Sequence, residues 1–201
     1  MRAKREDKRE DLRARLIEAA TARIISGGLK RLRARDVTSD AGCALGALYN
    51  AFADLDDLVM HVNSATLKRL DAAIGVAISE VDDPGEVLKV LALGYLAFAR
   101  DNRPLWRALF EHHLPDNVAQ PHWQLAEHEA LIEHIVEPLA KLQPALNDKE
   151  LRIRSRSLFA AVHGIISISL EGRFVGIAEA ALATEVGRFV DIMVAGLKGR
   201  Q

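Results

Sequence analysis

Apolar residues recur at spacings of three and four through most of the chain, which is the pattern of helices with one buried face. No stretch alternates apolar and polar residues in the way of a half-buried strand. The pattern therefore predicts an all-α protein of about nine helices, over residues 9–26, 35–41, 45–52, 55–81, 84–101, 105–113, 123–141, 148–174 and 178–197.

Glycine, proline and capping residues indicate where these helices begin and end. A glycine pair at 27–28 closes the first helix, and Pro84 is placed to start the fifth. Pro138 should either kink or end the last turn of the seventh helix. Asn147 or Asp148 caps the eighth helix.

Residues 34–53 form two short helices joined by a sharp turn. Val37 and Ala41 share an apolar face, and Gly42 can adopt the left-handed conformation that ends a helix. In the second helix, Leu48 and Phe52 face the core. Two helices joined by a short turn containing glycine describe a helix-turn-helix, whose second helix enters the major groove of DNA.

Several residues of this region stand at fixed spacing: Asp36, Val37, Ala41, Gly42, Gly46, Leu48, Tyr49, Phe52 and Leu58. Over roughly residues 10–65, this set resembles the TetR/AcrR family of bacterial transcriptional regulators. Tyr49, followed three residues later by Phe52, is the most diagnostic part. The resemblance implies a three-helix DNA-binding head at residues 1–54 and a helical ligand-binding and dimerisation body at residues 55–201.

Three features depart from the family pattern. Ala44 stands where the family usually has Ser or Thr, and Leu55 stands where it usually has a Lys that touches a phosphate. Asp54 is placed to cap the fourth helix, with Asp57 three residues on, but these carboxylates and Asp56 would also repel a phosphate. These departures favour a modified or weaker contact with DNA.

The second helix of the motif carries few side chains that can read bases. Direct readout needs hydrogen-bond donors or acceptors, and only Tyr49 and Asn50 are polar there. The resemblance implies that Tyr49 contacts a phosphate, while Ala47 or Leu45 could meet a thymine methyl group. The predicted DNA-binding residues are Arg33, Arg35, Ala44, Leu45, Gly46, Ala47, Tyr49 and Asn50.

The distribution of charge supports an anionic partner at one end of the chain. Residues 1–70 hold 14 of the 27 Lys and Arg but only 10 of the 28 Asp and Glu, although the net charge of the whole chain is −1. The basic segment 1–9 is predicted to be a frayed arm. It could reach phosphates or the minor groove, or serve as a solubilising tail.

The family resemblance implies a pocket for a small effector in the body. The aromatic residues would suit an apolar or aromatic ligand, although each of them could equally fill the core. The predicted ligand-binding residues are Phe98, Trp106, Phe110, Trp123, Phe159 and His163.

Two C-terminal segments resemble a subtype of the family named for a Trp-His-Gly signature. His163 and Gly164 match it, but Val162 occupies the Trp position. The largely apolar helices at about 148–174 and 178–197 are the pair that forms a four-helix dimer interface in this family. The chain is therefore expected to form a homodimer through them.

Other functional classes find little support in the sequence. No P-loop, nucleophile elbow, dinucleotide-binding loop or zinc-ligand spacing occurs, so neither a catalytic residue nor a cofactor is expected. Several histidines and glutamates lie close together within residues 111–134, but His128 and His134 are six apart and no H-x-x-x-H or H-E-x-x-H motif occurs. No apolar run is long enough to cross a bilayer, and the single Cys43 fits a reducing cytoplasm.

These observations predict a homodimeric, cytoplasmic transcriptional regulator. Its partners would be a double-stranded palindromic operator and a largely apolar small molecule that releases it from DNA. The principal alternative is a helical small-molecule-binding dimer whose DNA-binding head has degenerated. An enzyme on a helical scaffold is a third hypothesis, which would require turnover of a bound ligand.

Overall fold

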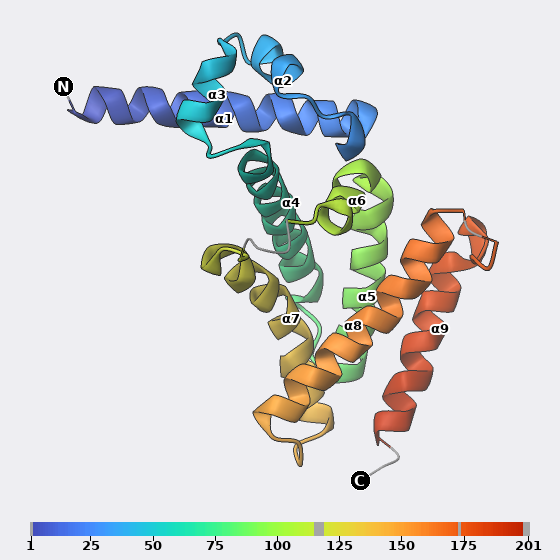
Figure 1. The fold of residues 1–201 in the computed structure, drawn as a ribbon. Helices are drawn as coiled ribbons and strands as arrows, with labels where there is room; N and C mark the ends of the chain where they lie inside the picture. Colours follow the sequence, from blue (N-terminus) through green and yellow to red (C-terminus); the bar gives the residue numbers. More distant parts are fainter. Residues whose placement is uncertain (1, 115–118, 173, 199–201) are drawn as a thin grey trace. The chain divides into compact units, whose positions relative to one another are not determined.

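The structure is a computed structural model in which residues 2–114, 119–172 and 174–198 are described. All regular structure within these ranges is helical, which confirms the predicted fold class (Figure 1). The helices are α1 (Arg2–Gly27), η1 (Leu29–Arg31), α2 (Ala34–Asp40), α3 (Leu45–Ala51), α4 (Leu55–Ile78), α5 (Pro84–Asp101), α6 (Arg103–Glu111), α7 (His122–Leu142), α8 (Asp148–Leu170) and α9 (Glu179–Lys198).

The chain divides into two compact units, each drawn from two stretches of sequence. The first unit comprises residues 1–68 and 102–125, and the second comprises residues 69–101 and 126–201. The first unit therefore holds α1, η1, α2, α3, α6 and the beginnings of α4 and α7. The second holds α5, α8, α9 and the remainders of α4 and α7.

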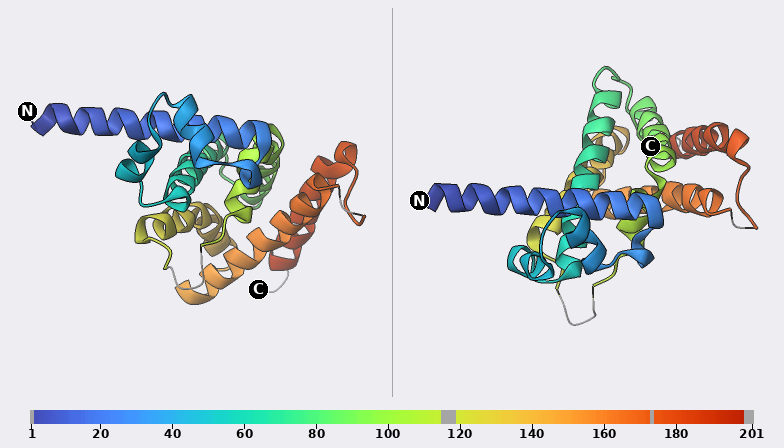
Figure 2. Two further views of the ribbon diagram at one scale, coloured as in Figure 1. Left: turned by 45° about the horizontal axis from the view of Figure 1, so that its top comes forward. Right: turned by 90° about the horizontal axis from the view of Figure 1, so that it is seen from above.

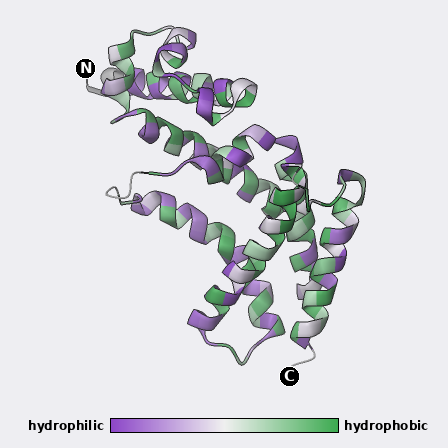
Figure 3. Cartoon of the chain, turned by 45° about the vertical axis from the view of Figure 1, so that its right-hand side comes forward, coloured by the Kyte–Doolittle hydropathy of each residue, from purple (hydrophilic) through white to green (hydrophobic). Residues whose placement is uncertain are grey.

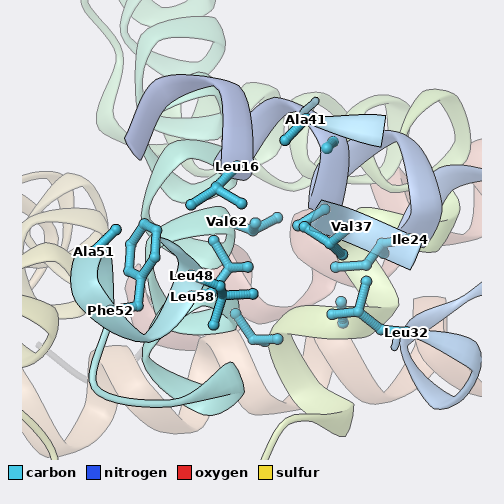
Figure 4. Packing of buried hydrophobic residues seen from close by; sticks show 14 of the residues in the cluster. Leu16, Ile24, Leu32, Val37, Ala41, Leu48, Ala51, Phe52, Leu58 and Val62 are labelled. Carbon is cyan, nitrogen blue, oxygen red and sulfur yellow. The ribbon is translucent and has the colours of Figure 1, made fainter. Parts of the chain in front are cut away.

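The core of the first unit forms where α1 packs against α2, α3 and α6. Leu16, Ile24, Val37, Leu48 and Leu58 have no exposed surface and converge from four helices (Figure 4). Burying a side chain of this size contributes about 1.5–3 kcal/mol relative to exposure. This shared core holds the two helices of the helix-turn-helix motif in place.

The first helix starts earlier than the sequence pattern indicated. α1 begins at Arg2, so the prediction of a frayed arm at 1–9 is wrong for residues 2–9, while residue 1 lies outside the described part. Figure 2 shows this end of α1 projecting beyond α2 and α3. Lys, Arg and Glu are strong helix formers, and extending an existing helix needs no new nucleation. A high density of charge therefore did not mean an irregular chain.

The start of α4 has the capping arrangement that the sequence predicted. The Asp57 amide donates to Asp54 Oδ1 over 2.7 Å. In return, Asp57 Oδ2 accepts from the amide of Ala53 over 2.9 Å, one residue before the cap. These bonds satisfy two backbone donors that would otherwise lack partners at the helix start.

In the second unit, α9 packs against both α5 and α8. A Cβ atom on Gly85 would lie 2.8 Å from Cγ1 of Val194, so glycine permits the close approach of α5 and α9. α8 and α9 run in opposite directions (Figure 1), and Figure 3 shows hydrophobic and hydrophilic residues mixed along this part of the chain.

The structure decides which residue caps α8 and whether Pro138 ends α7, two points that the sequence left open. Asn147 caps α8, and a reciprocal capping box with Glu150 completes its first turn. α8 ends at Leu170, so the predicted extension to 174 is wrong, because Gly172 takes a left-handed φ of 67° that closes the helix. α7 continues past Pro138 and ends at Leu142, so the proline does not end the helix.

Candidate nucleic-acid interface and effector site

The turn between α2 and α3 is built around one glycine. Gly42 has a φ of 64°, which L-residues with a side chain rarely adopt. Beyond it, the amide of Cys43 donates to the carbonyl of Thr38 over 2.9 Å and closes the turn. The chain reaches Ala44 in an extended conformation, and α3 starts at the next residue.

The residues of α3 divide into a buried face and an exposed face. Leu48 and Ala51, together with Phe52 at the C-cap, are buried in the core of the first unit. Ala47 is half-buried. The exposed face consists of Ala44, Leu45, Gly46, Tyr49 and Asn50. The structure therefore places the predicted readers of α3 together on the outer surface, with 53% of Tyr49 exposed.

Exposed arginines lie at the N-terminal end of α2. Arg33 is the N-cap residue, and its guanidinium donates to the carbonyls of Lys30 and Leu32, each over 3.0 Å. Arg35 is exposed in the first turn of the helix. Asp40 is the last residue of α2, and Arg23 of α1 forms two hydrogen bonds with it, one of 2.7 Å. These bonds raise the pKa of Arg23 and lower the pKa of Asp40. Arg33 and Arg35 thus present positive charge on the motif, whereas the charge of Arg23 is neutralised by its partner.

Two further arginines, which the sequence reading missed, tie α1 to the ends of the motif helices. Arg15 donates to the carbonyl of Ala41 over 2.6 Å, and Arg13 donates to the carbonyl of Ala51. The last carbonyls of a helix lack partners within it, and cations stabilise that end. In the sequence, Arg13 and Arg15 are only a basic pair just before a buried turn of α1. Their contacts with the ends of α2 and α3 became visible only in the tertiary structure.

The three aspartates at the start of α4 all have local partners. Asp54 and Asp57 cap the helix, and Asp56 lies 3.1 Å from His112 Nε2. Leu55, at the family's usual Lys position, is half-buried against the core of the first unit. The acidic group therefore has a structural explanation, while the phosphate-contacting Lys is absent.

Three of the six predicted ligand-binding residues lie in the first unit. Trp106 is fully buried, and its ring meets Phe110 edge-on at a centroid distance of 5.6 Å. Trp123 is 38% exposed and stacks on His61, with the ring centroids 5.1 Å apart. Trp106 and Phe110 therefore form one aromatic pair, and Trp123 forms a separate stack with a residue that sequence reasoning did not select.

The other three predicted ligand-binding residues lie in the second unit. Phe159 and His163 stack on one face of α8, with the ring centroids 5.7 Å apart. Tyr95 adds its ring edge to Phe159 and places its hydroxyl 2.9 Å from His163 Nδ1. Phe98 is buried on α5. Tyr95 was missed as a site residue, although its position three before Phe98 on an apolar helix was the available signal.

Burial lowers the pKa of His163, with Glu171 acting in the opposite direction. The imidazole is therefore held neutral more readily than an exposed histidine, and a neutral Nδ1 without a proton can accept from the Tyr95 hydroxyl. An aromatic cluster with one donor–acceptor pair can bind a flat, mostly apolar molecule that carries a polar group.

Two other kinds of site find no support in the described ranges. No group of three or more His, Cys, Asp and Glu residues there could hold a metal ion. His134 instead faces Asp71 across 2.8 Å. None of the described helices is both long and apolar enough to cross a membrane.

The second unit leaves several large apolar side chains exposed. Ile153 and Ile168 lie on α8, Ile192 lies on α9, and Phe174 and Val175 lie in the loop between the two helices. Scattered apolar residues are normal on a surface, and five of these exposed side chains lie on one helix pair and its connection.

Taken together, the buried core and the outward face of α3 define a helix-turn-helix protein with a helical body. A family model described as the C-terminal domain of tetracyclin repressor-like proteins matches residues 88–197, more than half of the chain. The chain belongs to the TetR family and has the fold of its transcriptional regulators. The Trp-His-Gly subtype stays a prediction.

Solved structures share this fold at low sequence identity. A protein with unknown function from Rhodococcus sp. RHA1 is 22% identical, with 93% of this chain and 95% of that chain covered and a TM-score of 0.75. The TetR family transcriptional regulator PfmR from Thermus thermophilus is 18% identical over 90% and 97%, with a TM-score of 0.61. RolR in complex with resorcinol is 20% identical over 96% and 94%, with a TM-score of 0.67. A comparison with the curated proteins finds no match.

Proposed function

We propose that this protein is a sequence-specific, DNA-binding transcriptional regulator that acts as a homodimeric repressor and is released from its operator by a small, largely apolar effector. In this proposal, residues 1–54 bind DNA and residues 55–201 bind the effector and the second subunit. The outward face of α3 carries the proposal, since Leu45, Tyr49 and Asn50 are exposed while Leu48 is fully buried.

The chemistry of this face favours phosphate contacts over base readout. Tyr49 offers a hydroxyl group, Arg33 and Arg35 offer positive charge, and Gly46 allows the backbone to approach DNA closely. Asn50 is the side chain with a donor and an acceptor for a base edge. Affinity should therefore depend strongly on salt, because bound phosphates release counterions.

The effector is proposed to be an aromatic or largely apolar molecule with a hydroxyl or similar polar group. The cluster of Tyr95, Phe159 and His163 in the second unit supports this. RolR, which has a similar fold, was solved with resorcinol, a small aromatic ligand. Effector and operator would compete through one conformational equilibrium, so each should weaken binding of the other.

A homodimer through α8 and α9 is the proposed assembly. The exposed Ile153, Ile168 and Ile192 on these helices support it. Two-fold symmetry then requires a palindromic operator, with half-sites about 34–36 Å apart or a multiple of that distance.

Selection of DNA from a random duplex pool by the purified protein tests the proposal. A palindrome should be enriched by the wild type and lost with Tyr49→Ala and Arg35→Ala. Arg107→Ala provides the matched control, because it removes an exposed arginine from α6, outside both the proposed DNA-binding residues and the proposed dimer helices. Weak, salt-labile binding without any enriched sequence would contradict the proposal.

A second candidate function is a small-molecule-binding dimer with a degenerate head. Leu55 favours it, since this residue packs against the core where a phosphate-contacting Lys is usual. The aspartates of α4 do not favour it, because capping and His112 account for them. Effector binding with no DNA selection would support this second function.

A further inference from the structure

Arg13 on α1 contacts three parts of the first unit. Its guanidinium donates to the carbonyl of Ala51, the last residue of α3, and lies 4.2 Å from the centre of the Phe52 ring. It also approaches Nε2 of His61 on α4 to 2.8 Å. One half-buried side chain therefore joins α1, the C-terminal end of α3 and the second turn of α4.

The hydrogen bond between Arg13 and His61 can run in one direction only, with Arg13 as the donor and His61 as the acceptor. A guanidinium offers only donors, so Nε2 of His61 must accept the hydrogen bond and carry no proton. The Asp57 carboxylate Oδ1 lies 3.6 Å from the same nitrogen, beyond hydrogen-bond distance. His61 thus acts as the acceptor that fixes the orientation of Arg13.

His61 is itself held by aromatic rings. Trp123, in the first turn of α7, stacks on it with an interplanar angle of 16°, and Phe52 meets it at 60° with the centroids 5.4 Å apart. A displacement of Trp123 would therefore remove one of the two rings that hold His61, and His61 in turn orients Arg13. Trp123 remains 38% exposed, so it can also meet a ligand.

We propose that Arg13 and His61 are positioning residues for DNA recognition, and that Trp123 couples them to the start of α7. Arg13 holds the C-terminal end of α3 in position, and His61 orients Arg13. Movement of the first turn of α7 would weaken the hold on both the His61 and the Arg13 side chains. This inference rests on the proposed function, since it presumes that α3 binds an operator. It adds a route from the first turn of α7 to the recognition helix.

Two rival roles for Arg13 make different predictions. If Arg13 only contacted a phosphate, a lysine in its place would preserve affinity, because the charge would remain. If it only stabilised the fold, loss of operator affinity would follow loss of thermal stability in every variant. A positioning role requires the forked geometry of arginine, which reaches two acceptors at once.

The test measures affinity of the full-length protein for the selected operator, together with thermal stability and amide hydrogen exchange of residues 45–52. The variants are Arg13→Met, Arg13→Lys, His61→Leu and His61→Gln. Arg107→Met is the matched control, because it removes the same charge from an exposed position of the first unit, on α6 and outside the residues proposed to bind DNA. Trp123→Leu removes the stacking partner.

We expect Arg13→Met and Arg13→Lys each to weaken operator binding about tenfold and to speed exchange at the end of α3. His61→Gln, which keeps an acceptor, should retain most of the affinity that His61→Leu loses. Trp123→Leu should weaken operator binding several-fold, while Arg107→Met should bind nearly as tightly as the wild type.

Wild-type affinity in Arg13→Lys, or equal losses in Arg13→Met and Arg107→Met, would overturn the positioning role while leaving the proposed function intact. A wild type that selects no sequence would overturn both the proposed function and any role in DNA recognition. Unchanged amide hydrogen exchange at residues 45–52 in Arg13→Met would show that Arg13 does not hold the end of α3. This measurement needs no DNA, so it overturns that part of the proposal independently of operator binding.

Discussion

The two units of this protein differ in what they leave on their surfaces. The first unit buries the large apolar residues of its helix-turn-helix. The exposed face of α3 carries small or polar side chains, and Leu45 is the one large aliphatic residue on it. The second unit leaves Ile153 and Ile192 more than half exposed on α8 and α9. The first unit also exposes Ile25, Phe110 and Leu125, but these lie on three different helices. In the second unit most of the exposed large apolar side chains lie on α8, α9 and the loop between them, where we propose that a partner binds.

The starts of α8 and α3 also differ in how they are capped. Asn147 and Glu150 form a full capping box at α8, while Ala44 provides no side-chain bond at the start of α3. A missing cap costs about 0.5–2 kcal/mol. At the start of α3 the amide of Ala47 donates to the carbonyl of Ala44 over 2.9 Å, so a backbone oxygen takes the place of a side-chain cap there.

The largest effect should come from emptying the core of the first unit. Leu48→Ala should lower the free energy of unfolding by about 2–5 kcal/mol, because it leaves a cavity at a fully buried site. Leu45→Ala on the same helix is the control and should change stability by less than about 0.5 kcal/mol. Urea unfolding measures both, and equal losses would show that the two faces of α3 are not distinct.

The next effect tests the open face of the second unit. Ile192→Glu should convert a dimer into monomers at micromolar concentration, raising the dimer dissociation constant more than about 100-fold, because a charge would be buried without a partner. Val76→Glu, on an exposed position of α4, should leave the dimer unchanged. Sedimentation equilibrium measures the assembly. A dimer that survives Ile192→Glu would place its interface elsewhere.

The smallest effect concerns His163 and sharpens the contrast between buried and exposed histidines. Burial lowers its pKa in the folded state, so the unfolded chain binds the proton more readily. The folded state should therefore lose stability as the pH falls below the ordinary histidine value of about 6.5, and the loss should level off below the folded pKa.

His163→Gln should reduce this loss as the pH falls through the ordinary histidine range, as measured by urea unfolding at each pH. The exposed His122→Gln is the control and should follow the wild type. An identical pH profile in all three proteins would show that other groups govern acid sensitivity.

Local patterns predicted most of the fold but not the partners of its charged side chains. The spacing of Leu16, Val37 and Leu48 indicated the buried faces, and all three are fully buried. The charged residues before residue 10 were wrongly predicted to be an irregular arm, because charge density does not distinguish a solvated helix from a disordered chain. The predicted α8 also ran past a glycine whose left-handed conformation ends the helix.

The sequence alone determined the helical period, the helix-turn-helix with its glycine turn, and the residues on the outer face of α3, since these depend on neighbours within a few positions. Only the tertiary structure decided that Arg13 reaches Ala51 and His61, that Trp123 stacks on His61, and that Tyr95 meets His163. These contacts join residues 38 to 68 positions apart, and local periodicity holds no information about which distant helix face a side chain meets.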